Sequence, residues 1–225
     1  IQQAGKALYA AGLPVPAVGE LVEIEGQYCQ VYDRNQGRTF ADELLTISGP
    51  EEECVGRLAP LFAEAHAKIH LAGDLGVDLP KQKEHFAEII KSNSALSSEM
   101  KSAVLERLAH LPERNIVCHG DYHPFNILQS PEGPIIIDWS GVQLGDPMAD
   151  VAWAVMLCEG FRRMMPEIDE AVVRFTKIYL ERYFALTGAV YEQIEAWWPV
   201  VCAVRLADPV PELYDWLLEE IKAGL

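Results

Sequence analysis

The segment from residue 115 to residue 153 most constrains the fold, because it places ionisable and amide side chains directly after short apolar runs. Ile116 and Val117 form a short apolar run that ends in the turn His119-Gly120-Asp121. Two further apolar runs, at residues 127–128 and 134–137, flank the sequence Ser-Pro-Glu-Gly at 130–133. A cluster of turn-forming residues between two apolar runs predicts a β-hairpin.

The expected register of this hairpin brings polar groups together. A turn centred on Glu132 would pair Ile127 with Ile137 and Asn126 with Asp138. Asp121 precedes Asn126 on a loop that must return to the same end of the hairpin. Two carboxylates and an amide oxygen in a loop-rich site suit Mg²⁺, which takes few protein oxygens and keeps positions for phosphates.

The spacing of Asp121 and Asn126 follows H-x-D-x-x-x-x-N, the pattern of kinase catalytic loops. The motifs HGD-x-x-x-x-N, then I-D-W ending at Trp139, then G-D-P-x-x-D ending at Asp150, occur in that order. This segment resembles the aminoglycoside phosphotransferase and choline kinase-like family. The resemblance implies that Asp121 accepts or orients the proton of an acceptor hydroxyl. It also implies that Asn126 and Asp138 bind Mg²⁺ that bridges the phosphates of ATP, with GTP as an alternative nucleotide.

The resemblance implies an α+β, protein-kinase-like fold: a mainly helical large lobe carrying the catalytic hairpin, and an incomplete small lobe. A helix at 1–11 and strands at 21–24 and 27–32 are expected from the sequence pattern. The resemblance assigns residues 1–33 to the end of the small lobe and the hinge, and residues 34–225 to the large lobe. The hinge backbone at Gln30, Val31, Tyr32 and Asp33 would meet the adenine. An ordinary hairpin followed by a linker is the other interpretation.

The nucleotide-binding motifs of the small lobe are missing from the sequence. It contains neither G-x-G-x-x-G nor G-x-x-x-x-G-K-[ST]. The resemblance implies that the glycine-rich loop and the phosphate-binding lysine would lie before Ile1. Lys6 falls on the first expected helix and is a poor substitute. The chain is therefore expected to be a fragment or a relative with a reduced small lobe, and a non-catalytic kinase-like binding or regulatory protein is the alternative function.

Helical patterns dominate the remainder of the chain. Gly49-Pro50-Glu51 is expected to open a helix whose apolar face includes Leu58, Phe62 and Ile69. His66 and His70 lie beside this face, and we interpret them as structural because no third ligand is near in sequence. Further helices are expected at 84–91, 98–111, 167–186, 191–206 and 212–223, with an N-cap at Ser97 or Ser98.

Other polar residues of the central segment have structural interpretations. Asp146 suits an N-cap and Pro147 the first helical turn. The resemblance implies that Asp146 and Asp150 brace the site without taking part in the chemistry. His119 is expected to bond to the backbone near Asp138, the alternative being contact with substrate. His123 is expected to shape the following turn, outside the metal ligands.

Charge and composition limit the possible partners. The net charge of −16 excludes a nucleic-acid partner, which would need a basic face. Residues 111–150 carry six acidic groups and one basic group, which favours Mg²⁺ and a cationic acceptor, although acidity also serves solubility. No apolar run is long enough for a membrane span. The five scattered cysteines indicate a cytoplasmic protein with reduced thiols.

The acceptor is expected to be a small hydroxyl compound, aminoglycoside-like or choline-like, and the oligomeric state stays open. A metal-dependent hydrolase is a further alternative. It would need histidine ligands beyond His119 and His123.

Overall fold

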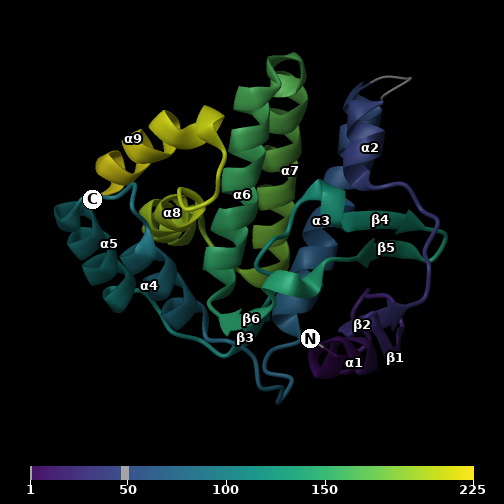
Figure 1. Ribbon diagram of the computed structural model, residues 1–225. Coiled ribbons are helices and arrows are strands. Elements are labelled where there is room, and N and C mark those ends of the chain that lie inside the picture. Colours follow the sequence, from purple (N-terminus) through teal and green to yellow (C-terminus); the bar gives the residue numbers. More distant parts are fainter. Residues whose placement is uncertain (1, 47–50) are drawn as a thin grey trace.

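The computed structural model describes residues 2–46 and 51–225 as an α+β arrangement in which helices predominate (Figure 1). Most of the expected elements are confirmed. The Gly49-Pro50 helix start lies outside the described residues, whereas the helix that it was expected to open is present. The helices are α1 (Gln2–Ala10), α2 (Phe40–Leu45), α3 (Glu51–Leu71), α4 (Gln82–Ser92), α5 (Ser98–His110), α6 (Pro147–Met164), α7 (Asp169–Thr187), α8 (Tyr191–Arg205) and α9 (Tyr214–Gly224).

Two of these helices have N-caps at the residues that the sequence predicted. The Ser97 side chain accepts a hydrogen bond from the backbone N–H of Met100 at the start of α5. At the start of α6, the Asp146 carboxylate accepts from the N–H of Met148, and Pro147 occupies the first helical turn. Both side chains satisfy N–H groups that have no partner within the helix.

Helices α3 and α7 lie side by side and run in the same direction. Three contacts advance by one helical turn along both helices. In each of them a residue of α3 meets the residue 113 positions later in the chain. This constant offset requires parallel axes. The contacts are Phe62 with Phe175, His66 with Tyr179, and His70 with Tyr183.

The core extends from this helix pair into α6 and α8. Phe62 is fully buried and its ring lies 4.4 Å from the ring of Tyr122, which follows the predicted catalytic aspartate. Val151 and Ala152 of α6 and Trp197 of α8 are also buried, as expected for apolar residues at helical spacing. The loop that carries Asp121 therefore rests directly on the main core.

The strands form three separate two-stranded antiparallel pairs within the described residues. The pair β3–β6 brackets the segment at residues 119–142, which carries the Asp121 loop, and the pair β4–β5 is the predicted hairpin (Figure 1). The strands are β1 (Val18–Ile24), β2 (Gln27–Tyr32), β3 (Ile116–Cys118), β4 (Ile127–Ser130), β5 (Gly133–Ile136) and β6 (Gln143–Gly145).

The predicted register of the β4–β5 hairpin is wrong by one residue. Ile127 pairs with Ile136, not with Ile137, and Ser130 pairs with Gly133. The turn is therefore centred between Pro131 and Glu132. Its geometry explains the shift, because the Ser130 hydroxyl accepts from the N–H of Glu132 and Gly133 adopts a φ of 122°.

The N-terminal elements form a small unit that touches the hairpin. Strands β1 and β2 are antiparallel and joined at Glu25-Gly26, where both residues have positive φ, as a two-residue hairpin turn requires. The N–H of Ile136 donates to the carbonyl oxygen of Pro14 at 2.6 Å, which ties this unit to β5. The division at residues 33 and 34 stays a prediction.

In the part of the chain that the structure describes, no helix combines the length and the apolar character needed to cross a membrane.

Replacing Phe62 by Ala is expected to destabilise the fold by about 3–5 kcal/mol, because the change leaves a cavity among Tyr122, Phe175 and Tyr179. Urea unfolding measures the loss. The matched control is Leu71→Ala in the same helix, where the side chain is 66% exposed and a change within about 0.5 kcal/mol is expected. Equal effects of the two substitutions would contradict the assignment of Phe62 to the core.

Candidate active site

The loop after β3 turns sharply at Gly120. This residue has a φ of +82°, and a Cβ atom added to it would lie 2.1 Å from the carbonyl oxygen of Gly141. Only glycine accommodates both the left-handed backbone and this close approach. Gly120 thus lets the chain reverse against residues 139–141 and directs Asp121 toward the surface.

The Asp121 carboxylate is held from two sides and remains reachable from solvent. Its Oδ1 accepts from Trp153 Nε1 at 3.4 Å, and its Oδ2 lies 3.4 Å from His123 Nε2. The side chain is 41% exposed. Burial raises the pKa of Asp121, but the contacts with His123 and Trp153 outweigh it and leave the pKa below its ordinary value. Asp121 is therefore an ionised and accessible carboxylate.

Asn126 is fixed in one orientation beside Asp121. Its Nδ2 donates to the carbonyl oxygen of Asp121 at 3.0 Å and lies 3.2 Å from His123 Nε2. The residue is 7% exposed. Because the Asp121 carbonyl oxygen engages the amide nitrogen, Oδ1 is the atom left to accept from a proton donor or to bind a cation.

Asp138 lies at the same end of the hairpin, although not opposite Asn126 as predicted. With the observed register, Ile137 is the residue whose N–H donates to the Asn126 carbonyl oxygen, at 2.9 Å, and Asp138 follows it. Asp138 is exposed and has a φ of 57°, and its Oδ1 accepts from the N–H of Ser140 at 3.4 Å. The left-handed backbone redirects its carboxylate out of the strand, which a pairing argument could not foresee.

The four predicted nucleotide-contacting residues lie at the end of β2 and just after it. Asp138 raises the pKa of Tyr32 in addition to the larger effect of burial, so Tyr32 lies near the hairpin end. The Gln30 side chain donates to the carbonyl oxygens of Gly19 and Val31, both at 3.0 Å. The N–H of Asp33 donates to Ala17 O. Val31 is exposed, and the adenine contact of these residues stays a prediction.

His119 has the structural role that the sequence predicted. Its Nε2 donates to the carbonyl oxygen of Ile137 at 3.0 Å, and its Nδ1 accepts from the N–H of Asp121 at 3.2 Å. Burial lowers the pKa of His119, which is consistent with a neutral ring that donates on one side and accepts on the other. Both ring nitrogens are engaged within the protein, which disfavours the hydrolase alternative.

Beneath the loop, the Asp150 carboxylate is fully buried and accepts four N–H groups. Its Oδ2 accepts from His119 N at 2.7 Å and from the Nε2 atoms of His66 and His70 at 3.1 and 3.2 Å. Its Oδ1 accepts from Gly120 N at 2.8 Å. Burial raises the pKa of Asp150, but the two histidines hold it well below its ordinary value. Asp150 of α6 thus braces the loop that presents Asp121.

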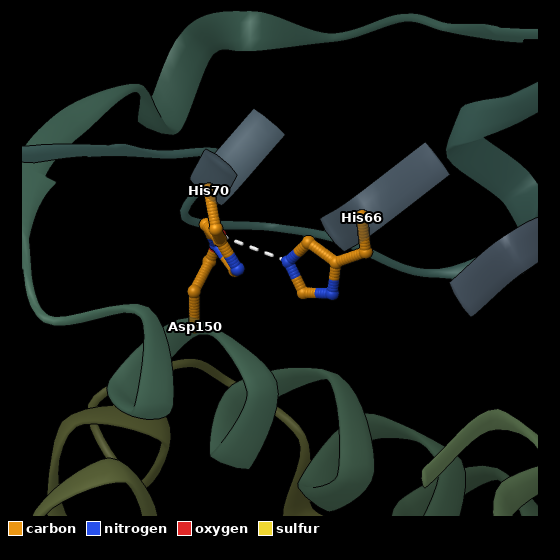
Figure 2. Close-up of side chains that lie close together, drawn as sticks. All are labelled: His66, His70 and Asp150. Atoms are coloured by element: carbon orange, nitrogen blue, oxygen red, sulfur yellow. Dashed lines mark hydrogen bonds and ion pairs between the residues drawn. The ribbon is translucent and has the colours of Figure 1, made fainter. Parts of the chain in front are cut away.

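The two histidines project from successive turns of α3 toward Asp150 (Figure 2). Among the described residues, His66, His70 and Asp150 form a group whose ligand atoms lie close enough for a metal ion. Their hydrogen bonds account for them without one. His66 Nδ1 accepts from the Tyr179 hydroxyl at 2.8 Å and His70 Nδ1 from the Tyr183 hydroxyl at 2.7 Å, so each ring has a hydrogen-bond partner on both sides. The structural interpretation of these histidines therefore fits the contacts.

Three residues of the site make contacts that the sequence analysis did not predict. His123 was expected to shape a turn, but it lies between Asp121 and Asn126. Trp153 was not considered, although its spacing of three residues from Asp150 places it on the same face of α6. Asp150 was recognised as a brace, but its contacts with His66 and His70 join residues more than 80 positions apart.

Comparison with known proteins identifies the family of the chain. A model of the family described as "Phosphotransferase enzyme family" (APH) matches residues 2–197. Acyl-CoA dehydrogenase family member 10 of Mus musculus is 26% identical over an alignment of 207 residues that covers 80% of this chain and 19% of that protein. The chain therefore spans about a fifth of the length of that relative.

Two solved structures share the fold at low identity. A thermostable mutant of aminoglycoside phosphotransferase APH(4)-Ia, in a ternary complex with ADP and hygromycin B, superposes with a TM-score of 0.68 at 20% identity, over 99% of this chain and 80% of that one. Amicoumacin kinase hAmiN, in complex with AMP-PNP, Ca²⁺ and Ami, also has a TM-score of 0.68, at 13% identity over 97% of this chain and 74% of that one.

The fold is therefore that of the protein-kinase-like phosphotransferases, as the sequence resemblance implied. The chain belongs to the phosphotransferase enzyme family.

The buried histidine His66 is expected to make stability fall as the pH drops below about 6.5. Burial lowers the pKa of His66 from 6.5 to about 3, so below pH 6.5 the unfolded chain binds a proton that the folded protein does not. Stability present at neutral pH is thus lost progressively on acidification. Urea unfolding of His66→Gln, which keeps an N–H donor toward Asp150, should show a shallower loss between about pH 6.5 and pH 5.

The matched control is His85→Gln on α4, where the side chain is exposed and the pH dependence should not change. An unchanged slope in His66→Gln would show that His66 does not carry the effect.

Proposed function

We propose that this protein is an enzyme that transfers the γ-phosphoryl group of ATP to a hydroxyl group of a small molecule. The observation that carries the proposal is the Asp121 carboxylate, which has a lowered pKa, is 41% exposed and is held by Trp153 and His123. In phosphoryl transfer the protein mainly positions groups and balances charge. A fixed, ionised carboxylate at the surface is the group that such chemistry requires at the acceptor.

In this mechanism Asp121 accepts a hydrogen bond from the acceptor hydroxyl and takes its proton as the oxygen attacks the γ-phosphorus. The bond from the γ-phosphorus to the bridging oxygen of ATP breaks in the same step, and ADP leaves. Trp153 holds Oδ1, so Oδ2 is the atom that turns toward the acceptor, beside His123. His119 keeps the loop backbone in place through Ile137 and Asp121. The brace at Asp150 restricts movement of this loop during the reaction.

The residues present fit Mg²⁺. Asn126 offers Oδ1, because its Nδ2 donates to the Asp121 carbonyl oxygen, and Asp138 offers an exposed carboxylate at the same end of the hairpin. Oxygen donors of this kind are the ligands that Mg²⁺ prefers. Bound there, the ion would neutralise charge that develops on the phosphates.

We further propose that residues 1–33 represent the end of a small lobe and that Gln30, Val31, Tyr32 and Asp33 contact the base. The effect of the Asp138 charge on the pKa of Tyr32 supports this placement, because it indicates that the end of β2 faces the hairpin end that carries Asp138. The ADP and AMP-PNP complexes of similar structures favour an adenine nucleotide over GTP.

The acceptor is proposed to be a small hydroxyl compound. The similar structures include proteins in complex with hygromycin B and with Ami, and the acidity of the chain favours a cationic, aminoglycoside-like or choline-like acceptor. A cytoplasmic location is part of the proposal and is supported by the five free cysteines.

Replacing Asp121 by Asn in the full-length protein should lower transfer at least about hundredfold, because the amide cannot take the hydroxyl proton. Binding of Mg²⁺ and AMP-PNP should stay within about twofold, since Asp121 is assigned to the acceptor and not to the nucleotide. A kinase assay coupled to ADP release measures turnover, and calorimetry measures binding. Asp78→Asn, at an exposed loop position, is the control and should leave both unchanged.

Replacing Asp138 by Asn should instead weaken binding of Mg²⁺ and AMP-PNP by about tenfold or more, since even the outer partners of metal ligands contribute about 10–100-fold. Asparagine tolerates the left-handed backbone at this position, so the fold should be kept. Unchanged affinity would place the metal elsewhere. Absence of nucleotide binding in the unsubstituted protein would favour the non-catalytic alternative.

A further inference from the structure

An apolar cavity of about 60 Å³ lies directly beside the catalytic loop. It is lined by α2, by the turn that contains Pro124 and Phe125, by the C-terminal part of α6 and by the start of α7. None of the described residues that line it carries a charge, an amide or a hydroxyl group. This composition contrasts with the net charge of −16 of the chain.

Aromatic rings connect the lining of the cavity with the surroundings of the Asp121 carboxylate. The phenyl rings of Phe125 and Phe161 form part of the cavity wall and lie 5.4 Å apart. Both rings also flank the imidazole of His123, at 6.0 and 6.4 Å. His123 Nε2 is in turn 3.4 Å from Asp121 Oδ2. A ligand whose hydroxyl lies at Asp121 can therefore extend toward the cavity past His123.

The chemistry of the walls selects an apolar occupant. A single water needs about 10–15 Å³ and two to four polar partners, so this cavity has room for several heavy atoms but little to offer a water. Two of its wall residues, Phe125 and Leu45, expose 38% and 40% of their surface, and covering this surface is favourable. A sugar hydroxyl or an ammonium group entering the cavity would lose its hydration without gaining a hydrogen bond.

We propose that the acceptor carries a short aliphatic group next to its hydroxyl and that this cavity binds that group. The inference rests on the proposed phosphotransferase function and names the class of acceptor: a small amphiphilic alcohol. Any charged group of the acceptor lies outside the cavity. The apolar group positions the hydroxyl at Asp121, and Trp153, which donates to Asp121, lies at the opposite side of the carboxylate from His123.

The test uses straight-chain primary alcohols from ethanol to heptanol as probes, with the full-length protein and without nucleotide. Binding is followed by NMR through the methyl signals of Ala171 and Val172 in the cavity wall and through the indole N–H of Trp153. The dissociation constant should fall about fourfold for each methylene group that enters, until the cavity is filled. The Trp153 signal should move together with the methyl signals.

Val172→Phe and the smaller change Ala171→Leu fill the cavity and should remove the dependence on chain length. Val173→Phe is the matched control, because Val173 is exposed on the same helix and outside the cavity wall, and it should bind the alcohols like the unsubstituted protein. Binding without chain-length dependence, binding that Val172→Phe and Ala171→Leu leave intact, or methyl shifts without a shift of Trp153 would each overturn the proposal.

This measurement is independent of the proposed phosphoryl transfer. Asp121→Asn should keep the chain-length dependence while losing turnover. If the alcohols bind as expected but the protein transfers no phosphoryl group, the proposed function fails and the cavity remains a binding site for aliphatic groups. If transfer occurs but the alcohols do not bind, the cavity is not the acceptor site.

Discussion

The arrangement depends on one buried carboxylate, that of Asp150. Burying a charge is unfavourable unless hydrogen bonds replace the lost hydration, and here four N–H groups from α3 and from the loop do so. The two histidines that donate to it are themselves held by tyrosines of α7. A single charge thus links α3, α6, α7 and the loop. Removing one partner from such a group typically costs about 3–5 kcal/mol, so these elements cannot shift independently.

This brace explains how an exposed aspartate can be positioned accurately. Asp150 holds the backbone at His119 and Gly120, and Gly120 packs against Gly141 with a backbone that only glycine adopts easily. The loop is therefore fixed from below, by the core, while Asp121 faces outward beside His123 and Asn126. Such a division between a rigid support and an accessible reactive group is what positioning-dependent catalysis requires.

Charge and shape act on different parts of the proposed acceptor. The carboxylates of Asp121 and Asp138 belong to the end where phosphate and metal would meet, whereas the cavity beyond His123 offers only apolar surface. The net negative charge alone favoured a cationic acceptor, because the sequence gives the number of charged residues but not their positions in the folded protein. The structure places apolar residues next to His123, which contacts the proposed catalytic residue Asp121, so the acidity of the chain does not by itself describe the proposed acceptor site.

Local pattern was sufficient for much of the protein. Several features depend only on residues close in sequence: the helix periodicity, the hairpin, the caps at Ser97 and Asp146, and the motif spacing of Asp121, Asn126 and Asp138. From these features the sequence by itself determined the fold class and the family. Tertiary structure decided the rest. The hairpin register shifted by one because turn geometry, not the position of a residue in the turn motif, sets the pairing. His123 and Trp153 at Asp121, the histidines at Asp150 and the cavity walls are brought together by packing between distant segments, and no local periodicity encodes such contacts.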